Sequence, residues 1–180
     1  MGKSRAVPVE TRFWQKVDKN GPTMPGMKSQ CWVWTAYSSE VSPGFRYGQI
    51  RHNGKACFAH RVAYLLQTGQ DPTGFDVDHI CHNTLCVRGT HLRLATRSQN
   101  NQNVRGARRD NRSSGVLGVY WHSKLCKWYA RVGHNNQDHY LGVFNSIESA
   151  EAAVIAKRCE LFSHNDRDRK VMPILGEKAC

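Results

Sequence analysis

Residues 76–103, DVDHICHNTLCVRGTHLRLATRSQNNQN, decide how the first half of the chain is interpreted. The stretch brings metal-binding and proton-accepting side chains close together in sequence: Asp78, His79, Cys81, Cys86 and His91. A carboxylate binds hard cations, a thiolate binds soft metals, and an imidazole accepts protons near neutral pH. Few structural roles need all three kinds of group in one short segment. A site that hydrolyses phosphodiester bonds does need them.

Local patterns divide this stretch into a strand, a loop, a second strand and a helix. The segments FDVDHI, residues 75–80, and HLRLA, residues 91–95, each predict a short strand. The polar segment between them predicts a loop. Thr96 is a suitable N-cap for a helix that runs through residues 98–109.

Asp78, His79 and Asn100 are the residue types that metal-dependent phosphodiester hydrolysis uses. The reaction needs a water molecule made more basic and a cation that stabilises charge on the leaving oxygen. Asp78 offers an oxygen ligand suited to Mg²⁺ or Mn²⁺, and Asn100, near the start of the predicted helix, can supply a second. His79 is the candidate general base. We therefore expect Mg²⁺, or Mn²⁺, as the catalytic cofactor.

Cys81 and Cys86 are closely spaced in a polar loop, which favours a structural zinc site. Tetrahedral Zn²⁺ needs two more donors. Cys31, at the start of an earlier β-like segment, and His91, at the base of the loop, would complete a closed Cys₃His set. His91 ranks first as fourth donor because it would hold both ends of the loop. The alternative fourth donors are His82 and Cys57.

The composition indicates an intracellular protein with a polyanionic partner. The chain has 180 residues, with 26 Lys and Arg against 14 Asp and Glu, and a formal net charge of +12. A surplus of this size points to nucleic acid. Its seven cysteines are interpreted as metal ligands or thiols before disulfides. Since no apolar run has transmembrane length and the N-terminus lacks a signal-peptide core, we expect a soluble, cytoplasmic protein.

The residues before the central stretch predict several short elements. A helix is expected over residues 10–18, followed by β structure from Cys31 onward. Asn53-Gly54 predicts a hairpin turn, and a helix that ends at Gly69 follows.

Several separated motifs in residues 11–103 resemble HNH nucleases, which have the ββα-metal fold, in the branch of phage and homing endonucleases. The motifs are RFWQKVD at 12–18, CWVW at 31–34, AHRVAY at 59–64 and the central stretch. The resemblance implies that Asp78 and Asn100 are the metal ligands and that His79 is the general base. His91 takes the middle motif position, often Asn in such enzymes, where it braces the loop by hydrogen bonding or by binding zinc.

Residues 104–113 are interpreted as a basic linker between residues 1–103 and a second domain. Arginines that would track a phosphate backbone are Arg105, Arg108, Arg109 and Arg112. The alternative is a flexible connector that only stays soluble. Arg61, next to the predicted site, would contact the scissile phosphate or pair with a carboxylate.

Residues 114–163 predict three strands and a helix, and residues 164–180 are a charged tail. The segments 114–119, 127–132 and 140–144 and the Ala-rich residues 148–156 resemble the plant APETALA/ethylene-response-factor DNA-binding domain, which also occurs fused to HNH nucleases in phage. The resemblance implies a three-stranded sheet that enters the DNA major groove. The implied contacts are Tyr120, His122, Lys124, Lys127, Trp128 and Arg131. Packing is the alternative role for Trp128.

The expected fold is α+β: a zinc-stapled ββα-metal nuclease domain followed by a small three-stranded antiparallel sheet packed on one helix. The expected function is a DNA endonuclease, of homing type, that nicks one strand of double-stranded DNA as a monomer, in a bacterial host cell if phage-encoded. A non-catalytic, sequence-specific DNA-binding protein derived from a nuclease is the alternative. RNA is a less favoured substrate because its deep groove suits a sheet poorly.

Overall fold

A computed structural model describes residues 7–103, 106–107, 111–166 and 168. The chain forms two compact units, Met1–Arg97 and Ser98–Cys180. The unit boundary thus falls a few residues before residue 103, where the sequence placed the end of its first domain. Among the described residues, no helix has the length and apolar character needed to cross a membrane.

The first unit contains an antiparallel sheet in the order β3-β4-β5 and a short antiparallel pair, β1-β2. These strands are β1 (Val17–Asp18), β2 (Val33–Trp34), β3 (Ser38–Ser42), β4 (Phe45–His52) and β5 (Lys55–Phe58). Asn53 and Gly54 form the turn between β4 and β5 with positive φ angles of 49° and 75°. The predicted hairpin is therefore confirmed.

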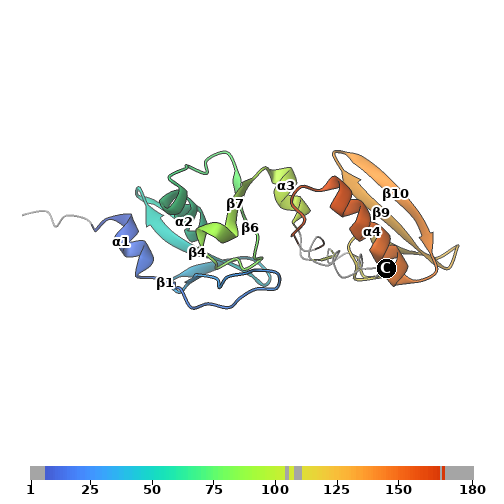
Figure 1. Cartoon of the computed structure of the whole chain (residues 1–180), viewed down its shortest axis with the longest axis horizontal. Helices are drawn as coiled ribbons and strands as arrows, with labels where there is room; N and C mark the ends of the chain where they lie inside the picture. Colours follow the sequence, from blue (N-terminus) through green and yellow to red (C-terminus); the bar gives the residue numbers. More distant parts are fainter. Residues whose placement is uncertain (1–6, 104–105, 108–110, 167, 169–180) are drawn as a thin grey trace, which may run out of the picture. The chain divides into compact units, whose positions relative to one another are not determined.

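Helix α2 (Ala59–Thr68) lies against β4 (Figure 1) and ends at Gly69, whose φ is 73°. The Gly69 N–H donates to the carbonyl of Leu65, so the glycine closes the helix as its sequence position predicts. The core beneath α2 is apolar and includes Phe13, Trp34, Ile50, Val62 and Val77.

Helix α1 (Val9–Trp14) is shorter than the helix predicted over residues 10–18. Val17 instead lies in β1, where it pairs with Trp34 of β2. A β-branched valine suits an extended ladder, and β2 supplies backbone partners that no local pattern reveals.

The central stretch forms the antiparallel hairpin β6 (Asp76–His79) and β7 (Leu92–Ala95), as predicted. A single 3₁₀ turn, η1 (Gly89–His91), leads into β7. Helix α3 (Arg97–Gln102) follows β7 in the chain, although the sequence predicted a helix that continues to residue 109. Strand, loop, strand and helix therefore follow one another as expected, while a ββα-metal arrangement of these elements stays a prediction.

In the second unit, an antiparallel sheet in the order β10-β9-β8 packs against α4 (Figure 1). Its elements are β8 (Val119–His122), β9 (Lys127–His134), β10 (Gln137–Phe144) and α4 (Ile147–Leu161). The Ser146 hydroxyl caps α4 by accepting a hydrogen bond from the Ser149 N–H. Val119, Ala130 and Val132 of the sheet form a core with Ala150 and Val154 of the helix. The mixed α+β class is as expected.

Candidate functional site

Three cysteines and one histidine form a buried cluster in the first unit. Cys31, Cys81, Cys86 and His91 each offer one ligand atom, and these atoms all lie within 4.8 Å of one another. Nδ1 of His91 lies 3.6 Å from Sγ of Cys86 and 3.7 Å from Sγ of Cys31. One nitrogen and three sulfurs with this spacing suit a tetrahedral metal such as zinc.

Backbone pairing brings the loop cysteines to the N-terminal part of the chain. The Val87 N–H donates to the Trp32 carbonyl at 2.7 Å, and the Trp34 N–H donates to the Leu85 carbonyl at 2.9 Å. A further bridge joins Val33 and Cys86. These hydrogen bonds align the loop with β2, so Cys86 lies close to Cys31 despite the long separation in sequence.

Close backbone packing near Cys31 requires a glycine. The Gly21 N–H donates to the Cys31 carbonyl at 3.1 Å. A Cβ atom at position 21 would lie only 2.6 Å from the Cys31 carbonyl oxygen and 2.5 Å from the Val33 side chain. Any larger residue at position 21 would therefore require residue 21, Cys31 or Val33 to shift.

His91 is the fourth member of the cluster, rather than His82 or Cys57. His91 is almost completely buried, and its Nε2 lies 2.8 Å from the Ser29 hydroxyl, which leaves Nδ1 facing the sulfurs. This second contact orients the ring, as partners of metal-binding histidines do. Cys57 is half-buried in β5 and lies outside the cluster, as does His82.

The three thiols differ in acidity. Hydrogen bonding between Cys81 and Cys86 is the largest cause for both: it lowers the pKa of Cys86 to about 5 and raises the pKa of Cys81. Burial, followed by the charge on Cys86, raises the pKa of Cys31 to about 11. At neutral pH the cluster therefore holds a thiolate on Cys86 and thiols on the other two cysteines. A bound cation would take up this negative charge and deprotonate the remaining thiols.

His79 ends β6 as a buried imidazole with a defined orientation. Its Nε2 lies 3.1 Å from the backbone carbonyl of Cys86. A carbonyl oxygen only accepts hydrogen bonds, so Nε2 carries the proton in the neutral ring and Nδ1 carries the lone pair. This tautomer makes Nδ1 the atom that can accept a proton.

Aromatic side chains surround His79 on one side. The His60 ring lies 4.8 Å from the His79 ring between centroids, and the Tyr47 ring lies 6.1 Å from it. Burial, then the neighbouring His79 and Arg61, lowers the pKa of His60 well below its usual value, so His60 is neutral. Tyr47 comes from β4, and no local sequence signal pointed to it.

Asp78 precedes His79 in β6 and is also buried. One carboxylate oxygen, Oδ2, accepts hydrogen bonds from Nε and Nη2 of Arg93 at 2.9 and 2.8 Å. A carboxylate is the kind of hard oxygen donor that Mg²⁺ or Mn²⁺ binds. The Asp78 site therefore fits a divalent ion by its donor chemistry. No local sequence pattern points to Arg93, which the strand register places opposite Asp78.

Asn100 lies in α3, at the start of the second unit, and is half-buried. Its predicted role, as a ligand that shares one ion with Asp78, stays a prediction.

In the described part of the chain, the hydrogen bonds of Arg61 go to backbone carbonyls. Its guanidinium donates to the backbone carbonyls of Phe75 at 2.8 Å and Pro72 at 2.9 Å. Arg61 thereby ties α2 to the loop before β6 and supports the strand that carries His79. A contact between Arg61 and DNA stays a prediction.

The sheet of the second unit has one face that packs on α4 and one that does not. Alternation along β8 and β9 places the side chains of Tyr120, His122, Lys127, Tyr129 and Arg131 on the face away from the core. Tyr120 and Tyr129 stack at 5.2 Å between centroids, and the Arg131 guanidinium lies 5.2 Å from the Tyr120 ring. This face, called here the outer sheet face, carries four of the six DNA contacts expected within residues 114–163: Tyr120, His122, Lys127 and Arg131.

Trp128 lies on the opposite face of the sheet and packs against the core of the second unit. Its ring meets that of Trp121 at 4.9 Å. These contacts support packing, the alternative role of Trp128, while a contact between Trp128 and DNA stays a prediction. Lys124 lies in the turn after β8, and Arg112 is exposed. Arg105, Arg108 and Arg109 lie outside the described residues.

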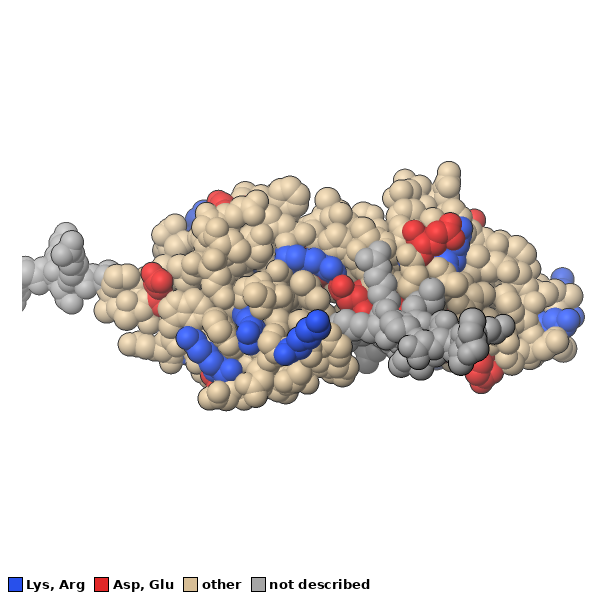
Figure 2. Space-filling view, viewed as in Figure 1, with Lys and Arg blue, Asp and Glu red and all other residues tan. Residues whose placement is uncertain are grey.

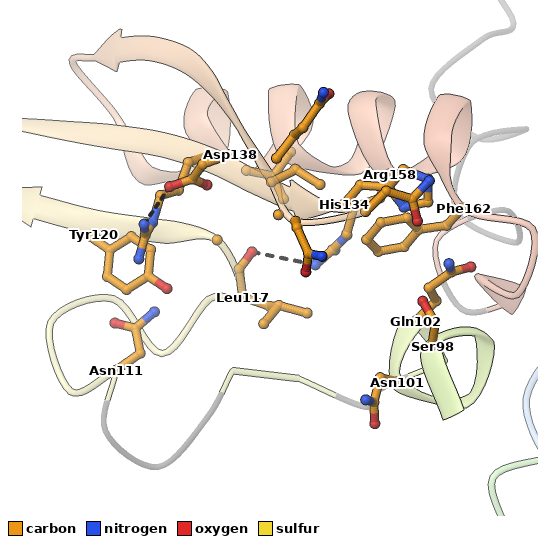
Figure 3. A pocket seen from close by; sticks show the side chains of 18 of the residues that line it. Ser98, Asn101, Gln102, Asn111, Leu117, Tyr120, His134, Asp138, Arg158 and Phe162 are labelled. Atoms are coloured by element: carbon orange, nitrogen blue, oxygen red, sulfur yellow. Dashed lines mark hydrogen bonds and ion pairs between the residues drawn. The ribbon is translucent and has the colours of Figure 1, made fainter. Parts of the chain in front are cut away.

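A hollow of about 770 Å³ lies beside the outer sheet face, within the second unit. Figure 3 shows Tyr120 and Asp138 at one end of it and His134, Arg158 and Phe162 at the other. Arg131 donates to Asp138 at 2.6 Å, and this hydrogen bond raises the pKa of Arg131. Arg158, which also lines the hollow, donates to the backbone carbonyl of Leu117. Arg131 and Arg158 thus both have hydrogen-bond acceptors within the protein.

Comparisons with known proteins agree with the resemblance to HNH nucleases. A family model described as HNH endonuclease matches residues 57–102, which include Asp78, His79 and three of the four cluster residues. Its match ends before the sheet of the second unit, so the likeness of residues 114–163 to the APETALA/ethylene-response-factor domain stays a prediction.

Two proteins of Escherichia phage T7 are similar to parts of the chain. Protein 7.7 is 40% identical over 58 residues, or 32% of this chain and 45% of that protein. Protein 2.8 is 31% identical over 78 residues, or 42% of this chain and 50% of that protein. The chain thus spans about half the length of the curated relatives it matches. No solved structure gives a significant match.

Proposed function

We propose that the chain is a metal-dependent DNA endonuclease that cuts one strand of double-stranded DNA. The observation that carries the proposal is the orientation of His79 within the part of the chain that matches the HNH endonuclease model. A buried imidazole with one nitrogen held by a carbonyl, next to a buried carboxylate, is equipped to deprotonate a water molecule beside a bound cation.

In the proposed reaction, Asp78 and Asn100 would hold a divalent ion such as Mg²⁺. When bound, this ion stabilises the negative charge that develops on the phosphate and on the leaving oxygen. Nδ1 of His79 takes a proton from water, and the water oxygen attacks phosphorus. The bond from phosphorus to the leaving sugar oxygen then breaks, and that oxygen takes a proton from solvent.

Zinc has a structural role in the proposal. The cluster of Cys31, Cys81, Cys86 and His91 has four protein donors and hence no open position for substrate. Its bound ion would hold the loop between β6 and β7 against β2. Because Cys86 also contacts His79, the same ion would keep the general base in place.

DNA binding is assigned to basic surface on both units and to the linker. On the face drawn in Figure 2, Lys and Arg side chains are spread over the lower part of the first unit rather than gathered in one cluster. The net charge of +12 supports contact with the phosphate backbone. The proposed contacts are Arg61, Arg105, Arg108, Arg109, Arg112, Tyr120, His122, Lys124, Lys127 and Arg131.

The outer sheet face is proposed to recognise the target in the major groove. A three-stranded sheet has the width to enter it, and Tyr120 and Arg131 can reach bases or phosphates there. One HNH site in a monomer accounts for cutting one strand per binding event. Homing-type activity inside a bacterial host is the biological role that we propose.

Incubation with supercoiled plasmid DNA tests the proposal. We expect conversion of supercoiled to open-circular DNA in Mg²⁺ or Mn²⁺ and none in EDTA. Mapping the new ends by primer run-off on candidate host DNA would identify the strand and the site. DNA binding without cleavage in either metal would instead support the non-catalytic DNA-binding alternative.

A further inference from the structure

The ion pair between Asp78 and Arg93 is largely enclosed in the β6-β7 hairpin. The two residues are directly opposite one another in the antiparallel register. Nε and Nη2 of Arg93 donate to the same carboxylate oxygen of Asp78, Oδ2. The Asp78 side chain is 7% exposed and the Arg93 side chain 22%. Such a pair is shielded from water and from screening by salt.

A second Asp–Arg pair on the same strand provides a comparison. Arg97 lies 3.2 Å from Asp76, two residues before Asp78, but the Arg97 side chain is 77% exposed. Exposed pairs of this kind contribute little to stability or to affinity. The Asp78 carboxylate therefore differs from that of Asp76 because its cation partner is mostly shielded from solvent.

We propose that Arg93 is a counter-ion that competes with the catalytic cation for the Asp78 carboxylate, and that Arg93 thereby sets the divalent-ion concentration at which the site fills. The inference rests on the proposed role of Asp78 as an ion ligand. Oδ2 already accepts two hydrogen bonds from a guanidinium, so an ion that binds Oδ2 takes the place of those hydrogen bonds, and an ion that binds the other carboxylate oxygen lies close to the same positive charge. Two cations at one carboxylate repel each other, so binding of the ion and pairing with Arg93 oppose one another.

The pairing of Arg93 with Asp78 stabilises the metal-free protein. A buried carboxylate without a partner is strongly destabilising, and Arg93 supplies that partner before the ion arrives. The cost is a lower affinity for the ion. Replacing Arg93 by an uncharged residue should therefore destabilise the metal-free fold and raise the affinity for the ion. A purely structural role for Arg93 would not produce this combination.

Direct binding of Mn²⁺ to the zinc-loaded full chain, without DNA, tests the inference. The loss of the free Mn²⁺ signal in electron paramagnetic resonance gives the Kd. We expect Arg93→Gln to lower the Kd by about tenfold or more, since hydrogen bonds to a charged group are lost, and tenfold corresponds to about 1.4 kcal/mol. The control Arg97→Gln removes the exposed partner of Asp76 and should leave the Kd within about twofold of the unchanged protein.

Further variants separate the possible failures. If Arg93→Gln does not fold, Arg93→Lys keeps a charge but loses the paired N–H donors, and it should lower the Kd by a smaller factor. A Kd that is unchanged or higher in a folded Arg93 variant overturns the inference and leaves the nuclease proposal intact. Unchanged Mn²⁺ binding in Asp78→Asn would show that Asp78 is not an ion ligand, which overturns the proposed catalytic site and the inference with it.

Discussion

The backbone carbonyl of Cys86 lies 3.1 Å from Nε2 of His79, so one residue is both a member of the thiol–imidazole cluster and the orienting partner of the proposed general base. The sulfur of Cys86 faces Cys31, Cys81 and His91, while its carbonyl faces the end of β6. Any movement of the loop that opens the cluster must also move the acceptor that fixes the His79 tautomer. Zinc binding and catalysis are therefore expected to be coupled through a single peptide unit.

Replacing Cys86 tests this coupling. Cys86→Ser should remove zinc from the purified protein, measured by atomic emission, and should lower plasmid cleavage by about 10- to 100-fold, as loss of an orienting partner does. Cys126→Ser is the matched control because Cys126 is an exposed thiol outside the cluster. A Cys86→Ser protein that lacks zinc yet cleaves DNA at the normal rate would contradict the proposed zinc role.

Replacing the proposed general base should separate cleavage from binding. His79→Ala should slow Mg²⁺-dependent nicking by about 10²- to 10⁴-fold while the gel-shift affinity for DNA stays nearly unchanged. His82→Asn is the control, because His82 lies in the same loop with a φ of 56°, which Asn tolerates. Loss of the folded state in His79→Ala, seen by circular dichroism, would instead make His79 a structural residue.

Local sequence patterns predicted the elements that local physics determines. The Asn53-Gly54 turn, the end of α2 at Gly69 and the hairpin of β6 and β7 follow from turn chemistry and strand alternation. The donor set of the cluster was also predicted, because closely spaced cysteines leave few places for the remaining ligands. His91 was predicted as the fourth ligand because it lies at the base of the loop and would hold both loop ends together.

Features that depend on partners distant in sequence were not predicted. Val17 joins a strand because β2 pairs with it, and Arg93 meets Asp78 because the β6-β7 register aligns them. The sequence left packing and DNA contact open for Trp128, and strand alternation groups its side chain with Ala130 and Val132 against the core. A local pattern does not determine a register, so contacts set by register appear only in the folded chain.

Zinc binding should release protons. The raised pKa values of Cys31 and Cys81 keep both thiols protonated near pH 7.5, whereas Cys86, with a pKa of about 5, is already a thiolate. Coordination by three thiolates therefore releases about two protons, and zinc affinity should rise about 100-fold per pH unit. Calorimetric titrations of zinc into zinc-free protein, in buffers of different ionisation enthalpy, give the number of protons released. Release of no protons would mean that Cys31 and Cys81 do not coordinate the ion.

The outer sheet face should contribute electrostatically to DNA binding. Arg131 pairs with Asp138 at an exposed position, so a phosphate can compete for the guanidinium at little cost. Arg131→Ala should weaken binding and reduce the slope of log affinity against log salt by about 0.9 if Arg131 contacts one phosphate. Lys157→Ala removes the same charge from α4, on the opposite side of the sheet, and should leave both quantities nearly unchanged. Equal effects of the two variants would mean that the outer sheet face is not the DNA contact.

His60 should make the fold sensitive to mild acid. Burial lowers its pKa below the ordinary value of 6.5, and the buried Nδ1 has no hydrogen-bond partner among the described residues. Below pH 6.5 the unfolded chain therefore binds a proton at His60 that the folded chain does not bind. Stability from this group is complete above pH 6.5 and is lost as the pH falls, by up to about 1.4 kcal/mol per pH unit.

The variant His60→Phe keeps an aromatic ring in this position and cannot take up the proton. At pH 7.5 its free energy of unfolding should equal or exceed that of the unchanged protein, because an unsatisfied buried nitrogen is gone. Between pH 7.5 and pH 5.5 it should lose about 1.4 kcal/mol less than the unchanged protein, measured by urea unfolding of the zinc-loaded chain. Equal losses over this range would mean that His60 can be protonated in place, next to His79, without opening the fold.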